Sequence, residues 1–270
     1  MTRADLIASL DRLLEAIVGG LPTGDLLSAA CRMTINGRTV HGSDLAALGV
    51  QRFAGLLNFA DTQTRQSVMM GVAFVDERMA PLSIRALVDL TGRLAEVEMI
   101  YSSDPQGPFA DVQELLRPDI VYAAPIPPSR RCDREALQAA ADDYWEGLQN
   151  SDGDIPTFHY RCDKYDNGAK TTNTLRTLLS PDRTIHSCAS ALDHTRPARP
   201  LARERRYPVL DPELGIAASF VMVDFHPIPD SPRPDAGSFY MMGVFKVVDR
   251  QIRMIDEIRE ILPLGAQSGW

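Results

Sequence analysis

Residues 31–37 read CRMTING, and residues 160–168 read YRCDKYDNG. Each stretch is short and ends in the dipeptide Asn-Gly. Asn-Gly favours a tight turn because both residues tolerate a positive φ angle. We therefore expect each stretch to be a strand followed by a hairpin turn, and their likeness indicates an internal repeat.

The repeat extends from these two strands toward the N-terminus. A shift of about 131 residues aligns the two copies without a gap. The matched identities are Arg3 and Arg134, Leu6 and Leu137, Ala8 and Ala139, Asp11 and Asp142, Glu15 and Glu146, Cys31 and Cys162, Asn36 and Asn167, and Gly37 and Gly168.

The order of predicted elements is the same in both copies. Residues 6–17 and 135–148 carry apolar residues at three- and four-residue spacing, which predicts a helix before each strand. Further helical segments are expected around 43–58 and 174–192, followed by long β-rich segments. This order predicts an α+β protein of two tandem cone-shaped domains, each a curved antiparallel sheet wrapped around N-terminal helices. We place the first domain and a Pro-rich linker at 1–125 and the second domain at 126–270.

Composition excludes several classes of partner. The 270 residues carry a net charge of −8, with 44% hydrophobic and 24% charged residues. A negative chain is unsuited to nucleic acid or to an anionic membrane surface, because both require clustered Lys and Arg. The N-terminal segment has acids within its apolar stretch, so it predicts an amphipathic helix and not a secretory signal. We expect a cytoplasmic protein.

Motifs for metals and cofactors are missing from the sequence. The four cysteines form no CxxC pair, and the five histidines show no HxxxH or HxH spacing, so no metal site is expected. GxSxG, GxGxxG and P-loop motifs are also absent, and we expect no cofactor. Cys162 and Cys188 leave two alternatives open, a disulfide or buried thiols, and a reducing compartment favours thiols.

Two motifs of the second copy carry a family resemblance. The first is filled by Cys162, Lys164, Tyr165, Asp166, Asn167, Gly168, Thr171 and Thr172, and the second by Arg205, Arg206, Pro208, Val209 and Asp211. With the element order, they resemble the nuclear-transport-factor-2-like superfamily, which includes ketosteroid isomerases and SnoaL-type polyketide-cyclase-like proteins. The resemblance implies a cone with an apolar pocket. It also implies sheets that pack face to face, here as a pseudo-dimer within one chain, and further assembly into a homo-oligomer.

Within this superfamily, the length of the chain and its tandem-domain plan resemble those of the cofactor-independent lyases of lignin-dimer breakdown. Those enzymes remove water and formaldehyde from a diarylpropane diol to give a stilbene. The resemblance therefore implies a small aromatic substrate and acid–base chemistry through a quinone methide. Two alternatives stay open: an isomerase or dehydratase acting on a polycyclic substrate, and a non-catalytic ligand-binding module.

The two copies differ where chemistry is expected. Lys164 and Asp166 stand where the first copy has Met33 and Ile35, so we expect the site in the second half. Alternation along 158–167 puts Tyr160, Lys164 and Asp166 on one face and Tyr165 and Asn167 on the other. Neither face is purely apolar, and the sequence leaves open which of them points into the pocket.

A second strand, 216–226, ends its apolar face in Asp224 and His226. A carboxylate against an apolar wall has a raised pKa, which suits proton transfer near neutral pH. Of Arg205 and Arg206, one is expected in a surface ion pair and the other on a phenolate or carboxylate. The predicted catalytic candidates are Lys164, Tyr165, Asp166, Asp224, His226 and Arg206. The predicted substrate-binding candidates are Tyr144, Tyr160, Asn167, Thr172 and Tyr240.

Overall fold

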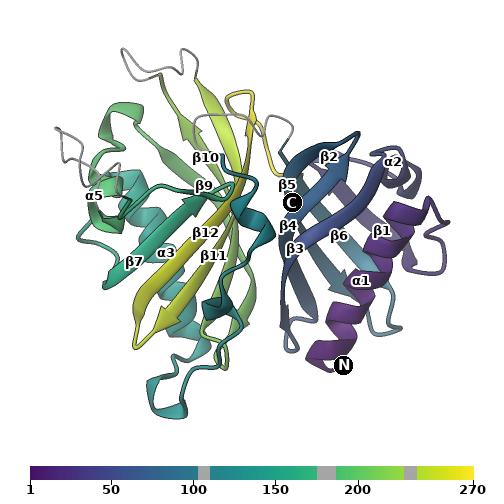
Figure 1. The fold of residues 1–270 in the computed structure, drawn as a ribbon, viewed down its shortest axis with the longest axis horizontal. Coiled ribbons are helices and arrows are strands. Elements are labelled where there is room, and N and C mark those ends of the chain that lie inside the picture. Colours follow the sequence, from purple (N-terminus) through teal and green to yellow (C-terminus); the bar gives the residue numbers. More distant parts are fainter. Residues whose placement is uncertain (103–109, 175–186, 228–235) are drawn as a thin grey trace.

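Each half of the chain forms one sheet with its own helices (Figure 1). The computed structural model describes residues 1–102, 110–174, 187–227 and 236–270. The first half contains α1 (Arg3–Gly19), β1 (Leu27–Ile35), β2 (Arg38–Thr39), α2 (Gly42–Ala46), β3 (Val50–Asp61), β4 (Gln66–Val75), β5 (Arg78–Val88) and β6 (Leu94–Tyr101). The second half contains α3 (Arg134–Asn150), β7 (Phe158–Asp166), β8 (Ala169–Lys170), α5 (Cys188–Asp193), η4 (Arg196–Ala198), β9 (Leu201–Asp211), β10 (Ile216–Phe225), β11 (Gly237–Val248) and β12 (Gln251–Leu262). The linker between them contains three short 3-10 helices, η1 (Glu114–Leu116), η2 (Ile120–Tyr122) and η3 (Pro128–Arg130).

The predicted repeat is confirmed by the bounds of the elements. Helix α3 begins 131 residues after α1 (134 − 3), β7 begins 131 after β1 (158 − 27), and β8 begins 131 after β2 (169 − 38). Both Asn-Gly dipeptides lie in turns with positive φ at each residue: 49° and 76° at Asn36 and Gly37, and 45° and 85° at Asn167 and Gly168. The turn chemistry read from the sequence therefore sets the position of the first hairpin in each copy.

The sheets confirm the predicted α+β class but are mixed. Their strand orders correspond, β2-β1-β6-β5-β4-β3 and β8-β7-β12-β11-β10-β9. Strand β1 pairs in parallel with β6, and β7 in parallel with β12, whereas the other pairs are antiparallel. The prediction of wholly antiparallel sheets is therefore wrong for these two strand pairs. A parallel pair requires a long crossover, and here the intervening strands of each copy provide it.

The helix predicted over 43–58 is wrong beyond its first turn. Helix α2 ends at Ala46, and β3 begins at Val50. Pairing of β3 with β4 satisfies the backbone there and overrides the local helical spacing. Of the corresponding segment 174–192, residues 175–186 lie outside the described residues, and α5 covers its C-terminal part.

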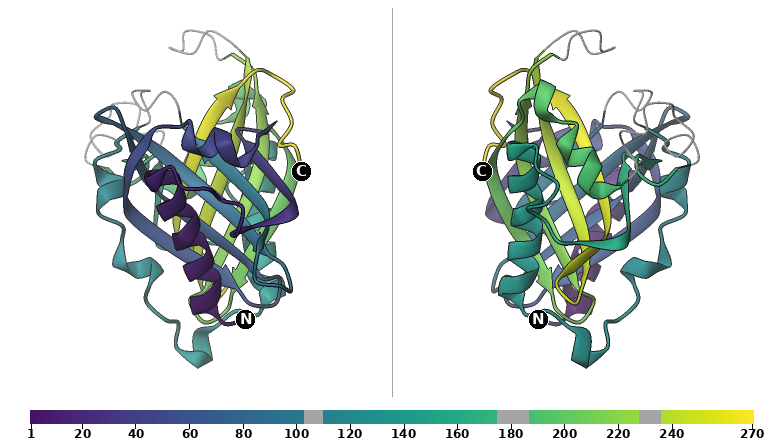
Figure 2. Two further views of the ribbon diagram at one scale, coloured as in Figure 1. Left: turned by 90° about the vertical axis from the view of Figure 1, so that its right-hand side faces the viewer. Right: turned by 90° about the vertical axis from the view of Figure 1, so that its left-hand side faces the viewer.

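The long helices cover the outer faces of the sheets (Figures 1 and 2). Helix α3 begins after Asp133, whose side chain accepts a hydrogen bond from the Ala136 amide at 2.8 Å. Its apolar side buries Leu137, Ala141 and Trp145 against the second sheet. None of the helices in the described ranges is long and apolar enough to cross a membrane.

The other faces of the two sheets pack against each other (Figure 1). Strand β10 shows how: Phe220 and Met222 enter the core between the sheets, while Val221 and Val223 enter the core under α3. Its residues from Ile216 to Val223 are all buried, so the strand has an apolar partner on both faces. The predicted pseudo-dimer is thus formed within one chain.

Reciprocal ion pairs show that the two halves are related by an approximate twofold axis. Arg3 pairs with Asp211 at 2.7 Å, and the repeat-equivalent Arg134 pairs with Asp61 at 2.6 Å. A buried pair also crosses the interface: Glu98 of β6, fully buried, binds Arg206 of β9 at 2.6 and 2.8 Å. Removing one member of a buried pair leaves the other charge unsatisfied.

We predict that Glu98→Gln lowers the free energy of unfolding by about 3 kcal/mol, because Arg206 loses its buried counter-ion. Urea unfolding monitored by circular dichroism measures the change. The control is Glu213→Gln, since Glu213 is exposed and pairs with Arg3 at 3.2 Å; it should change stability by less than about 0.5 kcal/mol. Equal effects of the two substitutions would contradict the prediction.

Candidate active site

A cavity of about 300 Å³ opens between the sheet of the second domain and its helices. This volume lies at the lower end of the range for small-molecule sites, about 300–1,000 Å³. All of its described lining residues belong to the second domain. Most of the wall is apolar: Leu148, Ala191, Leu192, Ala198, Pro200, Val223, Phe225, Phe239 and Met241.

Four ionisable side chains from two adjacent strands meet in this apolar wall. Lys164 and Asp166 alternate onto the cavity side of β7, and Glu257 and Arg259 do so on β12. The parallel register places Asp166 directly opposite Glu257. Two carboxyl groups therefore lie side by side, accompanied by two cations.

Close contacts join these groups into one network. The Lys164 ammonium donates to Asp166 and lies 2.9 Å from Oε2 of Glu257. The Arg259 guanidinium lies 3.6 Å from Oδ2 of Asp166. From α3, the hydroxyl of Tyr144 donates to Oε1 of Glu257 at 2.7 Å. Both oxygens of Glu257 are thus held, which fixes the direction of its carboxyl group.

Burial and neighbouring charges separate the two carboxyl groups. Burial raises the pKa of Glu257 to about 7; Lys164 opposes this shift, and the adjacent Asp166 adds to it. Burial would also raise the pKa of Asp166, but Arg259 and Lys164 outweigh it and hold that pKa well below its usual value. The pKa of Lys164 is raised, because its two carboxyl partners outweigh its own burial. Near neutral pH, Glu257 can therefore gain or lose a proton while Asp166 stays ionised.

Aromatic and imidazole side chains form the rest of the cavity. Phe225 and Phe239 stack with their centroids 4.3 Å apart, and Arg259 lies over the Phe239 ring at 5.0 Å. His194 and His226 also line the cavity, and both are exposed. The cavity thus combines a flat apolar wall, a charged network and two imidazoles.

The first domain carries no such network at the equivalent positions. Strand register and the repeat shift match Lys164, Asp166, Glu257 and Arg259 with Met33, Ile35, Met99 and Tyr101, and Tyr144 with Leu13. Met33, Met99 and Leu13 are buried in the apolar core under α1. At these positions, the charged side chains are therefore found in the second cone and not in the first.

Four of the predicted site residues line the cavity: Lys164, Asp166, His226 and Tyr144. Two more lie behind it. Thr172 accepts a hydrogen bond from the Lys164 amide at 2.9 Å, and Asn167 exchanges hydrogen bonds with the backbone of Arg259 at 2.9 and 3.1 Å. Both side chains therefore hold the backbone behind the network. The sequence had predicted that they would contact the substrate. Tyr160 is 80% exposed and lies outside the cavity.

The remaining candidates lie on the opposite face, between the sheets, which corrects their predicted placement. Arg206 and the buried Tyr240 both bind Glu98 of the first domain, and Tyr165 packs against the inter-sheet core. Asp224 pairs with Arg203 at 2.9 Å. Strand alternation is the reason: Phe220, Met222 and Asp224 share one face, and that face meets the other sheet.

The expected raised pKa of Asp224 is also wrong. Burial would raise it, but hydrogen bonds from Arg203 and Ser238 outweigh burial and lower the pKa. Of the two adjacent arginines, Arg205 has the expected ion-pair role: it pairs with Asp142 and Glu146 on α3 at 3.2 and 3.1 Å. Cys162 and Cys188 are free thiols, and Cys188 donates to the Cys162 carbonyl at 3.2 Å.

Sequence reasoning missed Glu257 and Arg259. The available signal was the strand QIRMIDEIREIL, residues 251–262, where Ile252 and Ile255 are apolar but Glu257 and Arg259 follow on the cavity side. The sequence did not show which strand pairs with residues 251–262. The parallel pairing of β12 with β7, about a hundred residues apart in the chain, brings these groups beside Lys164 and Asp166.

Residues 130–259 match a family model described as a domain of unknown function, DUF8021. No curated protein matches the chain. Similar solved structures include an LEH-like epoxide hydrolase from M. tuberculosis (15% identity, 47% of this chain and 85% of that chain, TM-score 0.35). The epoxide hydrolase/cyclase-like enzyme SalBIII is 10% identical over 47% of this chain and 92% of that chain, with a TM-score of 0.34. A de novo designed protein with a curved β-sheet is 14% identical over 43% of this chain and 97% of that chain, with a TM-score of 0.33.

We predict that Glu257 titrates near pH 7. Infrared difference spectra should show that the C=O stretch of a protonated carboxyl group disappears as the pH rises through 7. Glu257→Gln should remove the contribution of Glu257 to this signal. Asp256→Asn is the matched control, because Asp256 also has its pKa raised to about 7 but lies on the other face of β12. A wild-type signal unchanged by Glu257→Gln would refute the assignment.

Proposed function

We propose that the cavity of the second domain is the active site of a cofactor-independent acid–base enzyme acting on a small, hydroxylated aromatic molecule. The observation that carries the proposal is the pair Asp166 and Glu257, buried in an apolar cavity and separated in proton affinity. A carboxyl group that titrates near neutral pH can donate a proton at one step and take one at the next. The apolar wall suits aromatic rings.

For the reaction we propose the conversion of a lignin-derived diarylpropane diol into a stilbene, water and formaldehyde. Protonated Glu257 donates to the benzylic hydroxyl as the C–O bond breaks. The para-phenol loses its proton to an imidazole at the cavity, with His226 or His194 as acceptor, and water and a quinone methide result. Tyr144 and Lys164 hold Glu257 in the direction of the departing oxygen.

The second step returns the enzyme to its starting state. Ionised Glu257 takes the proton of the terminal hydroxymethyl group. The bond between that carbon and its neighbour breaks, formaldehyde leaves, and the electron pair forms the central double bond of the stilbene while the quinone methide becomes a phenolate. The phenolate then recovers the imidazole proton. Lys164 and Arg259 provide the positive charge that favours the anionic states.

We predict that Glu257→Gln lowers kcat by at least about 100-fold, the usual contribution of a positioned general acid–base. The amide keeps the shape of the side chain but cannot transfer the proton. Asp163→Asn is the control, since Asp163 precedes Lys164 on β7, pairs with Lys170 at 3.0 Å and does not line the cavity. Its kcat should stay within about twofold of wild type. An unaffected Glu257→Gln enzyme would exclude Glu257 as the acid.

The substrate assignment is tested separately. Incubation with a phenolic diarylpropane diol should give stilbene absorbance and trapped formaldehyde in equal amounts. The matched non-phenolic methyl ether should not react, because it cannot form the quinone methide. Absence of both products from the phenolic diol would overturn this substrate, and turnover of the methyl ether would overturn the quinone-methide route.

A further inference from the structure

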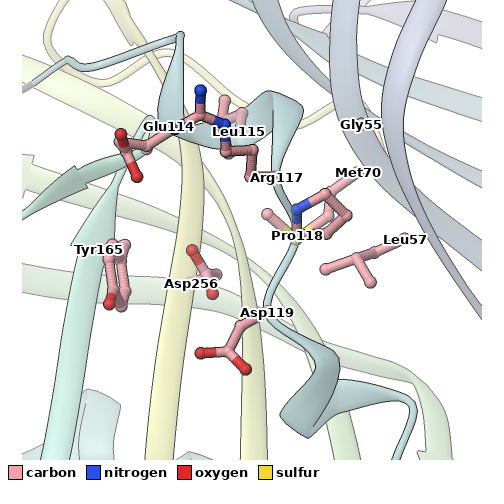
Figure 3. A pocket seen from close by; sticks show the side chains of 11 residues that line it. Gly55, Leu57, Met70, Glu114, Leu115, Arg117, Pro118, Asp119, Tyr165 and Asp256 are labelled. Atoms are coloured by element: carbon pink, nitrogen blue, oxygen red, sulfur yellow. The ribbon is translucent and has the colours of Figure 1, made fainter.

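A second cavity, of about 180 Å³, lies between the domains (Figure 3). Three parts of the chain line it: the first sheet, the linker and the second domain. The lining residues are Gly55, Leu57 and Met70, then Glu114, Leu115, Arg117, Pro118 and Asp119, and finally Tyr165, Gly168 and Asp256. Tyr165 and Asp256 alternate with residues of the candidate active site along β7 and β12. This cavity therefore opens on the opposite face of the same two strands.

Acidic and apolar side chains occupy different parts of the cavity. Figure 3 shows the carboxyl groups of Asp256 and Asp119 on the same side as Tyr165, with Leu57 and Met70 across from them. The Arg117 side chain extends toward the Glu114 side of the cavity, away from Asp256. Among the described residues, no Lys or Arg forms an ion pair with Asp256. The hydroxyl of the buried Tyr122 acts on this carboxyl group and lowers its pKa, in opposition to burial.

The approximate twofold axis shows what balances this acid in the other copy. Asp256 lies opposite Tyr165 in the pairing of β7 with β12, as Glu98 lies opposite Thr34 in the pairing of β1 with β6. Glu98 is therefore the twofold mate of Asp256. Its carboxylate binds the guanidinium of Arg206 at 2.6 and 2.8 Å and that of Arg85 at 2.6 Å.

The register of the neighbouring strands identifies what replaces Arg206 beside Asp256. Strands β4 and β10 begin at Gln66 and Ile216, so Met70 corresponds to Phe220. Leu57 lies opposite Met70 in the first sheet, as Arg206 lies opposite Phe220 in the second. Both Leu57 and Met70 line the cavity. An acid is therefore present in both copies. Beside Asp256, Leu57 stands at the position that Arg206 occupies beside Glu98, and the cavity lies there.

We propose that the cavity between the domains binds a small organic cation, whose guanidinium or primary ammonium group takes the place opposite Asp256 that Arg206 takes opposite Glu98. Asp119 provides a second carboxylate on the same side. Leu57, Met70 and Pro118 provide an apolar wall for the carbon chain of the ligand. Burial without a cationic partner raises the pKa of Asp256 to about 7, with Asp119 contributing to the shift, and a bound cation would relieve this cost. The site is distinct from the cavity assigned above to catalysis.

Calorimetric titration of the full chain with agmatine tests the proposal, and 1-pentanol serves as the uncharged probe. We expect saturable binding of agmatine and none of 1-pentanol. Asp256→Asn should weaken agmatine binding at least tenfold, whereas Glu213→Gln, which removes an exposed carboxylate outside the cavity, should leave it within twofold. Absence of saturable binding, or equal binding by Asp256→Asn, would overturn the proposal.

A second variant tests the same place by filling it. Leu57→Arg supplies the missing guanidinium on the protein, so it should abolish agmatine binding and raise Tm. Leu57→Met preserves the apolar wall and should bind agmatine like the wild type. Agmatine binding retained by a folded Leu57→Arg protein would refute the site, even if Asp256→Asn failed to fold.

Discussion

The burial of the two sheets against each other is the constraint on which the rest of this molecule depends. Each sheet has a helix on one face and the other sheet on its second face, so the central strands are enclosed on both sides. Strands in such an environment must be apolar on both faces, and any polar side chain on them requires a partner. Glu98 satisfies this requirement through Arg206 and Tyr240, and in doing so it connects the two halves.

The cone of the second domain departs from this apolar pattern, and the first domain shows the alternative. At equivalent positions the first cone has Met33, Ile35 and Met99 where the second has Lys164, Asp166 and Glu257. Buried charges cost stability unless each is paired. The first cone is filled by apolar packing at these positions, and the second holds a set of paired charges. Such a division is typical of a duplicated domain in which one copy provides the site.

Strands β7 and β12 connect the two cavities. Glu257 faces the helical side and Asp256 faces the first domain, and the pKa of each is raised to about 7 mainly by burial. The charges of Lys164 and Asp166 also act on Asp256 from the other side of the sheet. The pKa of Asp256 therefore depends in part on charges that lie on the other face of the same two strands.

The sequence by itself determined the repeat, the order of its first elements and the positions of the Asn-Gly turns, because these depend on local spacing and on backbone angles that few residues tolerate. It also indicated the second half as the place of the ionisable groups, since Lys164 and Asp166 replace apolar residues. Only the tertiary structure decided which face of each strand is the inside. Alternation says that Asp224 and Met222 share a face, but not that this face meets the other sheet. The pairing of β7 with β12 likewise could not be read locally, and it alone places Glu257 beside Asp166.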